Sequence, residues 1–392
     1  MNSDELLLFP ELADTPLDEP EDGGLLPSQM LAEMVLNGEI RAETPISPDQ
    51  IQPSSLDLRL GAIAYRVPAS FLPGKKATVL MRLQTLPIVE VDLSKPALLE
   101  RGGVYIIPLQ EELMLPDSFS AKGNPKSTTG RLDIFTRLIT DFADEFEEIY
   151  RGYRGKLYVE VAPLTFPVVV REGTRLNQLR IRKLRIRRGN PPGPDAMLHA
   201  LNKREPIIYS QERPAKPRID EGLRLSVDLH GVAGSDVIGY RAKRAAPPID
   251  LARVNYYELR DYWEPVLRNA SESIILDRDE FYILTSKEKV SIPPDYAAEM
   301  WPFDPSMGEF RIHYAGFFDP GFGWSSRERP EGSHAVLEVR SHGVPLLLEH
   351  GQVVARLIFE ELLTRPAKLY GRGIGSSYQS QHLTLSKQFK PN

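Results

Sequence analysis

The run Asn124-Pro-Lys-Ser-Thr-Thr-Gly-Arg131 gathers, in one short turn, residue types that bind anions. Lys126 and Arg131 carry positive charges, while Ser127 and Thr128 carry hydroxyl groups. Together with exposed backbone N–H groups around the glycine, these side chains could hold a phosphate. The run is not a Walker loop, because the pattern Gly-x-x-x-x-Gly-Lys is absent. An anion-binding loop and an ordinary surface loop both fit these residues.

The chain contains no cysteine, which excludes several kinds of chemistry. Disulfide scaffolds, catalytic thiols, iron–sulfur clusters and thiolate zinc sites all require that residue. The seven histidines include no pair at the i, i+4 spacing of a helical zinc site. His334, His342 and His350 recur every eight residues, and we interpret them as surface or turn residues. A Ser-His-Asp hydrolase is also unsupported, because no Gly-x-Ser-x-Gly elbow occurs. We therefore predict no metal site on the protein and no zinc.

Composition argues against nucleic acid and membrane as partners. The net charge of −6 and the pI near 5.8 are unsuited to neutralising phosphates along a nucleic acid. No apolar run approaches the ~20 residues of a membrane-spanning helix. The first residues lack the basic start and apolar core of a signal peptide, so we expect a cytoplasmic location.

Short β-branched runs separated by Gly and Pro dominate the chain from Ser54 onward, and such spacing is typical of antiparallel sandwiches or barrels. Examples are Val104–Pro108, Leu157–Val161 and Val168–Val170. One helix is expected from Pro27 to Asn37, on an apolar stripe of Met30, Leu31, Met34 and Val35. The sequence therefore predicts a mainly β protein with few helices, in which strands and turns position the candidate loop.

The second half of the chain resembles the first at an offset of 178 residues. Four residues of the first half return at this one offset: Glu160, Pro167, Gly173 and Leu179 return as Glu338, Pro345, Gly351 and Leu357. Ser55-Leu-Asp-Leu58 also has a counterpart in Ser226-Val-Asp-Leu229. We interpret the chain as a tandem duplication of one all-β unit.

The length of 392 residues suggests two or three domains of roughly 150 residues each. Residues 1–24 hold eight acids and no Lys or Arg, which predicts a disordered tail. We expect a first domain over 25–186 carrying the catalytic motifs and a second over 218–392 with a C-terminal tail. The Pro-rich basic stretch over 187–217 is interpreted as a linker.

Three motifs carry a resemblance to a known family. Lys126–Arg131, followed 29 residues later by Glu160, resembles the dCTP deaminase branch of the dUTPase-like superfamily. Gln52–Gly61 is similar to that family's N-terminal strand signature, and Ser377–Gln381 to its C-terminal tail. The resemblance implies tandem dUTPase-like β-sandwich or jelly-roll domains of the β-clip type. It covers most of residues 25–388.

The resemblance implies a hydrolase that converts dCTP to dUTP and ammonia without zinc, by attack on a cyclic amidine C–N bond in deoxynucleotide biosynthesis. A carboxylate must then take a proton from water and pass one to the ring nitrogen. By resemblance Glu160 fills this role, Ser127 helps to hold the water, and Arg131 orients it. Glu338, at the matching position, is expected to be structural and without a partner arginine, because the corresponding region of its half, Phe303–Glu309, lacks the Ser-x-x-x-Arg pattern.

The resemblance also implies the substrate contacts. They are Lys126 and Thr128 at the triphosphate, Thr140 at the base, Tyr153 at the deoxyribose, and Tyr378 and Gln381 in a glycine-hinged tail. Magnesium is expected to arrive with the triphosphate. Single-unit relatives form trimers with sites between subunits, so we expect a homo-oligomer; inhibition by dTTP stays open.

Two other functions remain open. A dUTP pyrophosphatase, or a bifunctional enzyme that continues to dUMP, would need an aspartate to activate water at the α-phosphate. A non-catalytic nucleotide-binding regulator is the third hypothesis, because β-sandwiches host many functions.

Overall fold

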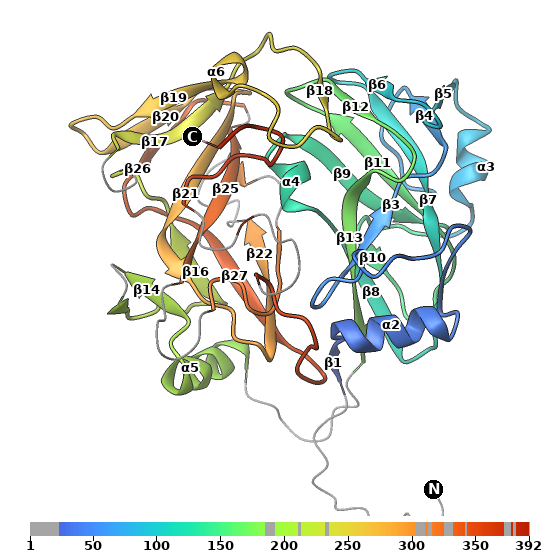
Figure 1. Ribbon diagram of the computed structural model, residues 1–392, viewed down its shortest axis with the longest axis horizontal. Coiled ribbons are helices and arrows are strands. Elements are labelled where there is room, and N and C mark those ends of the chain that lie inside the picture. Colours follow the sequence, from blue (N-terminus) through green and yellow to red (C-terminus); the bar gives the residue numbers. More distant parts are fainter. Residues whose placement is uncertain are drawn as a thin grey trace, which may run out of the picture.

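The computed structural model describes residues 23–184, 193–210, 213–231, 235–302, 310–312, 316–324, 332–341, 343–371, 378 and 382–391. The predicted tail over 1–24 lies outside the described residues except for its last two positions. Figure 1 shows two β-rich halves side by side, the first in blue to green and the second in yellow to red. The predicted mainly β class with few helices is confirmed. Within the described ranges, no helix is long and apolar enough to cross a membrane.

The N-terminal half (23–184) has helices α2 (Ser28–Leu36), α3 (Val79–Leu83) and α4 (Ser127–Gly130). Its strands are β1 (Gly24–Leu25), β2 (Ile40–Ala42), β3 (Leu56–Arg59), β4 (Ile63–Val67), β5 (Val89–Asp92), β6 (Ala97–Leu99), β7 (Val104–Met114), β8 (Phe119–Pro125), β9 (Ile134–Thr140), β10 (Glu148–Ile149), β11 (Arg154–Pro163), β12 (Val168–Val170) and β13 (Arg175–Lys183). One sheet has the order β1-β13-β8-β10, and a second has the order β5-β4-β7-β11-β9. Helix α2 confirms the helix predicted between Pro27 and Asn37, with Leu31 and Met34 buried.

The C-terminal half (193–391) has helices α5 (Pro194–Arg204) and α6 (Leu259–Tyr262). Its strands are β14 (Ile208–Ser210), β15 (Arg213–Pro214), β16 (Leu223–Ser226), β17 (Val237–Ala242), β18 (Ile249–Asp250), β19 (Trp263–Leu267), β20 (Ser273–Leu276), β21 (Phe281–Val290), β22 (Tyr296–Pro302), β23 (Phe310–Ile312), β24 (Phe317–Phe318), β25 (Ser333–Ser341), β26 (Leu346–Glu349) and β27 (Val353–Glu361). One sheet has the order β15-β14-β21-β17-β19, with β25 joining β21 to β23. A second has the order β16-β27-β22-β24.

Strand pairing in the second half repeats that in the first. Strand β11 lies between β7 and β9, as β25 lies between β21 and β23. Strand β13 pairs with β3 and β8, as β27 pairs with β16 and β22. Glu160 and Glu338 therefore occupy equivalent central strands, one in each half.

The stretch over 187–217, predicted as a linker without structure, contains α5, β14 and β15. Pro194 stands in the first helical turn, where proline is favourable because its fixed φ suits the helix and no N–H is needed. Leu198 and Leu201 are buried on the inner face of this helix. The interpretation of the whole Pro-rich stretch as a linker is therefore wrong, because part of it forms a helix and two short strands.

The apolar core of the first half extends into the second half, which also has a separate core of its own. Phe166 of the first half packs edge-on against Trp263 of the second, with ring centroids 5.4 Å apart. The C-terminal Phe389 belongs to the same cluster. Strand β18 of the second half pairs in parallel with β12 of the first. This packing brings β25 of the second half to the loop that follows β8 in the first (Figure 1).

Candidate active site

A cavity of about 50 Å³ lies between the halves. Ser127 and Arg131 line it from the first half, and Glu338 lines it from the second. The other described residues of its wall are Met300, Gly316, Phe317, Phe318, Asp319, Phe322, Val336, Tyr370 and Tyr378. Polar groups able to activate water therefore meet an aromatic wall that suits a flat ring.

Helix α4 presents Ser127 and Arg131 to the cavity. The chain turns sharply after β8, and the N–H groups of Thr129 and Gly130 donate to the carbonyl of Lys126. The Thr129 hydroxyl donates to the Leu176 carbonyl at 2.8 Å, which ties α4 to β13. A single helical turn fixed in this way places both ends of the Ser-x-x-x-Arg pattern at one cavity.

Arg131 is held from two sides. Its Nη1 donates to the Thr384 carbonyl at 2.7 Å, and its guanidinium carbon lies 3.7 Å from the centre of the Tyr378 ring. Its Nε lies 3.9 Å from Oε1 of Glu338, at the outer limit of an ion pair. The guanidinium is therefore oriented toward the carboxyl group without a short ion pair closing the gap.

Glu338 projects from the middle of β25 and is only 6% exposed. Burial raises the pKa of this carboxyl group to about 8, and the opposing attraction of Arg131 offsets that effect only in part. A carboxyl group with a pKa near neutrality can accept a proton and give it back at ordinary pH. Among the described residues that line the cavity, Glu338 has the environment that a general base requires.

The expectation that Glu160 lies beside Arg131 is wrong. Glu160 is 1% exposed in β11, and its Oε1 accepts hydrogen bonds from Nη2 and Nε of Arg137 at 2.7 and 3.1 Å. Arg137 stands opposite it on β9 and also stacks on Phe146, with 3.5 Å between guanidinium carbon and ring centre. The half that supplies the loop is not the half that supplies the carboxylate. The expectation that Glu338 lacks a partner arginine is also wrong, since Arg131 of the first half faces it.

Thr140 and Tyr153 lie with Glu160 and not at the cavity. Thr140 is buried at the end of β9, paired with Leu157. The Tyr153 hydroxyl donates to the Lys156 carbonyl at 2.6 Å. Neither residue lines the cavity. The reason is again that the sheet wall of the cavity belongs to the second half.

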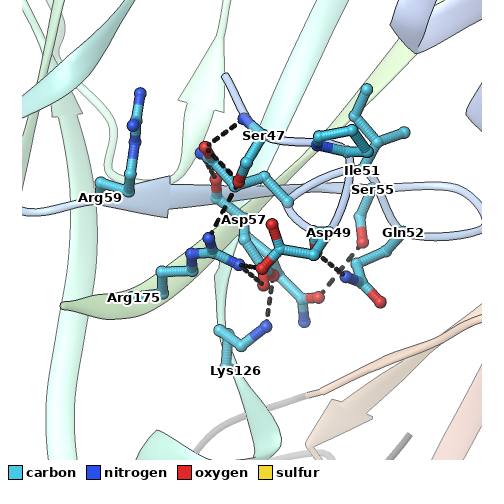
Figure 2. A network of polar contacts seen from close by, with 12 residues as sticks. Ser47, Asp49, Ile51, Gln52, Ser55, Asp57, Arg59, Lys126 and Arg175 are labelled. Atoms are coloured by element: carbon cyan, nitrogen blue, oxygen red, sulfur yellow. Dashed lines mark hydrogen bonds and ion pairs between the residues drawn. The ribbon is translucent and has the colours of Figure 1, made fainter. Parts of the chain in front are cut away.

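Lys126 is held in a polar network within the first half (Figure 2). Its Nζ donates to Oδ1 of the buried Asp57, whose Oδ2 lies 3.8 Å from Arg175. Arg175 also donates to Asp49 at 2.7 Å and holds the pKa of that carboxyl group at about 2. Burial raises the pKa of Asp57 despite the attraction of Lys126. This network fixes the start of the loop, so any phosphate contact by Lys126 competes with Asp57.

Thr128 and Tyr378 are brought together. Their hydroxyl oxygens lie 3.1 Å apart, and the backbone carbonyl of Thr128 accepts from Ser386 at 3.0 Å. The C-terminal segment of the second half therefore packs on the loop of the first. Gln381 lies outside the described residues.

Sequence reasoning did not assign a role to Asp319 or Tyr370, which both line the cavity. Oδ1 of Asp319 accepts from Ser54 of the first half at 2.9 Å. The turn Phe318–Phe322 was visible as a tight hairpin, and the 178-residue offset equates Glu338 with Glu160. These two features of the sequence point to Glu338 and Asp319, but only once it is known that the second half packs against the loop of the first.

One cluster of metal-ligating side chains occurs among the described residues, at Asp228, His230 and His350. The two imidazole rings are stacked in parallel with centroids 3.6 Å apart, and Nδ1 of His350 accepts from the Leu229 N–H at 3.1 Å. Ligating nitrogens must aim their in-plane lone pairs at one ion, which parallel stacked rings do not do. None of the three lines the cavity.

Two family models match nearly all of the chain. Residues 22–185 match the N-terminal domain, and residues 194–389 the C-terminal domain, of 2′-deoxycytidine 5′-triphosphate deaminase. A crystal structure of 2′-deoxycytidine 5′-triphosphate deaminase from Agrobacterium tumefaciens is 48% identical, with a TM-score of 0.81, and the match covers 87% of this chain and 99% of that one.

Curated relatives match more distantly. The dCTP deaminase of Natronomonas pharaonis is 30% identical over 128 residues, which span 32% of this chain and 60% of that protein. The dUMP-forming dCTP deaminase of Thermobifida fusca is 28% identical over 180 residues, which span 43% of this chain and 83% of that protein.

Proposed function

The chain belongs to the 2′-deoxycytidine 5′-triphosphate deaminase family, and from this premise we propose that it hydrolyses dCTP to dUTP and ammonia. The resemblance identified from the sequence is thereby confirmed at the level of the family. One observation carries the proposed site: Ser127 and Arg131 of one half share a cavity with Glu338 of the other. The reaction is a hydrolytic deamination that exchanges the 4-amino group of cytosine for an oxygen from water.

Glu338 is the proposed general base. In its ionised form it takes a proton from the attacking water as the water oxygen bonds to C4, and it passes a proton to the ring nitrogen. Glu338 then takes the remaining proton from the new C4 hydroxyl group and delivers it to the amino group. The C4–N bond breaks, ammonia leaves as the C4 carbonyl forms, and the carboxylate is regenerated. The raised pKa of Glu338 matches this exchange, because a weakly acidic carboxyl group accepts a proton more readily than an ordinary one.

Arg131 and Ser127 are proposed to hold the water and to stabilise the charge that develops on the base. Arg131 cannot collapse onto Glu338, because the Thr384 carbonyl and the Tyr378 ring fix its guanidinium. Its positive charge favours the ionised carboxyl group without quenching it in a short ion pair. Such fixed dipoles and charges are an effective form of transition-state stabilisation.

Binding of dCTP is proposed to involve the wall of the cavity around Tyr378. The Tyr378 hydroxyl lies 3.1 Å from that of Thr128, its ring stacks on Arg131, and its backbone is hydrogen-bonded to Tyr370. We propose that Thr128 and Lys126 contact the triphosphate in the nucleotide complex, while the Tyr378 ring stays stacked on Arg131. Gln381 is retained as a proposed contact of the same tail. Magnesium is proposed to arrive bound to the triphosphate, with no zinc involved.

Three wider features complete the proposal. The recurring strand pairings support a tandem duplication of one dUTPase-like jelly-roll unit. The second half would then replace the neighbouring subunit that supplies half of the site in single-unit relatives. Further assembly into a homo-oligomer, inhibition by dTTP and a cytoplasmic location remain proposals.

A bifunctional reaction that continues to dUMP is the alternative, because a matched relative from Thermobifida fusca is named dUMP-forming. Asp319 is the carboxylate of the cavity wall that could activate a second water at the α-phosphate. Its Oδ1, however, already accepts from Ser54 and Arg180, which favours a positioning role. Deamination alone is therefore the preferred proposal.

Product analysis tests these proposals. Purified protein is incubated with dCTP and magnesium, and ammonia, dUTP, dUMP and pyrophosphate are quantified separately. Ammonia with dUTP alone supports the monofunctional deaminase, whereas ammonia with dUMP and pyrophosphate supports the bifunctional enzyme. Cleavage of supplied dUTP without release of ammonia from dCTP would contradict deamination. Nucleotide binding without any product would favour a regulator.

A further inference from the structure

Arg180 of β13 leaves its own half and enters the other. It is 3% exposed, and both of its terminal nitrogens donate to backbone carbonyls of the second half. Nη1 donates to Ala298 at 2.9 Å, and Nη2 donates to Phe318 at 2.9 Å. Ala298 and Phe318 are paired residues of β22 and β24, so one guanidinium joins two neighbouring strands.

The same guanidinium contacts three consecutive residues of the cavity wall. Besides the Phe318 carbonyl, Nη2 donates to Oδ1 of Asp319 at 3.2 Å. The guanidinium carbon lies 4.0 Å from the centre of the Phe317 ring. Phe317, Phe318 and Asp319 all line the cavity, whereas Arg180 does not.

An arginine at this point is not a requirement of the sheet. The equivalent position in β27, at the 178-residue offset, is Ile358, and the strand pairing there is the same. Burying a guanidinium is costly unless its donors are satisfied, so its retention here calls for a reason beyond strand formation. Among the described residues, the guanidinium contacts two carbonyls, a carboxylate and a ring of the second half.

We propose that Arg180 is a positioning residue that fixes the Phe317–Asp319 wall of the nucleotide pocket from the opposite half of the chain. The inference rests on the proposed function, because the proposed function requires Phe317–Asp319 to contact the nucleoside. Arg180 touches neither Ser127 nor Glu338, so its loss loosens the wall while leaving the reacting groups in place. Substrate binding therefore suffers more than the chemical step.

The test compares Arg180→Met and Arg180→Lys with Arg182→Met. Arg182 lies two residues along the same strand and also pairs across the halves, with Glu360. Its side chain is 48% exposed, and it makes no hydrogen bond or ion pair to Phe317–Asp319 among the described residues. It is therefore a matched control for loss of a cross-half arginine. Ser54→Ala, which removes only the second donor to Oδ1 of Asp319, is a milder variant that keeps the core intact.

Two readouts are measured on the full chain. In steady-state ammonia release, Arg180→Met raises the KM for dCTP by about tenfold or more and changes kcat less, because it removes charged hydrogen bonds that hold the binding wall. Arg180→Lys restores part of the loss, Ser54→Ala shifts KM in the same direction by less, and Arg182→Met behaves as wild type. Amide hydrogen exchange over 316–324 rises in Arg180→Met but not in Arg182→Met.

The two readouts separate failure of this inference from failure of the proposed function. If exchange over 316–324 is unchanged in both Arg180 variants, the positioning role is overturned whatever the activity. A wild-type KM in Arg180→Lys and Ser54→Ala, with an active parent enzyme, overturns it as well. If the wild-type chain releases no ammonia but exchange rises as expected, the positioning role stands and the deaminase proposal is lost.

Discussion

Glu160 and Glu338 stand at equivalent positions of equivalent strands, yet their surroundings differ in the feature that decides their chemistry. Glu160 accepts two hydrogen bonds from Arg137, which lies opposite it in the same sheet. Glu338 faces Arg131 of the other half across 3.9 Å, and burial raises its pKa to about 8. The first carboxylate is locked in a local ion pair, while the second keeps the capacity to exchange a proton.

The comparison teaches that the position of a carboxylate in the unit does not determine its role. The arginine supplied within the same sheet holds Oε1 of Glu160 in two hydrogen bonds, which favours a structural role for this carboxylate. An arginine supplied across an interface, and fixed by Thr384 and Tyr378, leaves the carboxylate available. On the proposed assignment, one of two equivalent carboxylates serves stability and the other serves chemistry.

Apart from changes at the two glutamates themselves, the largest effect on this contrast is expected from Arg131. Arg131→Lys keeps the positive charge but loses the planar fork that reaches Thr384 and stacks on Tyr378, so kcat for ammonia release falls about 10²–10³-fold. The matched change Arg137→Lys in the Glu160 pair leaves kcat near wild type. Steady-state assays of both variants give the comparison, and equal losses in the two would refute it.

The pH profile sharpens the contrast. The ionised form of Glu338 is the proposed base, so kcat/KM is expected to increase about tenfold for each pH unit up to a pKa of about 8. Above that pH it is expected to level off. Arg131 lowers that pKa, so Arg131→Met moves the limb to higher pH. A limb that stays in place in Arg131→Met would show that another group titrates.

The same raised pKa has a consequence for stability. The pKa of Glu338 is about 8 in the folded protein, whereas the ordinary pKa of a glutamate is 4.5. Between these two pH values the folded state binds more protons than the unfolded state, so the free energy of unfolding decreases as pH rises. Glu338→Gln removes this dependence. Urea unfolding of wild type and variant at several pH values measures the difference, which should grow between those limits.

Breaking the structural pair should affect stability rather than catalysis. Arg137→Met leaves the buried Glu160 carboxylate without its partner and costs about 3 kcal/mol of unfolding free energy. Adding Glu160→Gln recovers part of this loss, because the uncompensated charge is gone. Denaturant unfolding checks both variants. A kcat that collapses in the folded Arg137→Met protein would place catalysis in the first half after all.

The smallest effect is expected at Tyr153. Tyr153→Phe removes a hydrogen bond to the Lys156 carbonyl and costs about 1 kcal/mol of stability. Since Tyr153 is not at the cavity, the KM for dCTP is expected to stay at its wild-type value. A large rise in KM would instead support the contact with deoxyribose that the family resemblance implies for Tyr153.

Local features of the fold could be predicted from the sequence. The run Val168–Val170 is β12, Val104–Pro108 begins β7, and Leu157–Val161 lies within β11. Hydrophobic runs and turn residues indicate which segments are strands, because strand formation depends largely on residues close together in the sequence. The Ser-x-x-x-Arg loop was likewise visible, and Ser127 and Arg131 do share a cavity.

The site as a whole could not be predicted, because it is completed by contacts between residues about 200 positions apart. Motif spacing identifies Arg131 and a glutamate on a strand, but not which of two equivalent glutamates packs against that arginine. The clue lay in Arg137, which stands opposite Glu160 and supplies a local partner. Recognising it requires the register of β9 against β11, which a single sequence does not reveal.

The most direct test of the central claim is a side-by-side assay of Glu338→Gln and Glu160→Gln for ammonia release from dCTP. Both are isosteric changes at equivalent positions, so each serves as the control for the other. The expected result is a fall in kcat of about 10²–10⁴-fold for Glu338→Gln and near-wild-type turnover for Glu160→Gln. Loss of activity in Glu160→Gln with activity retained in Glu338→Gln would contradict the assignment of the site to the interface between the halves.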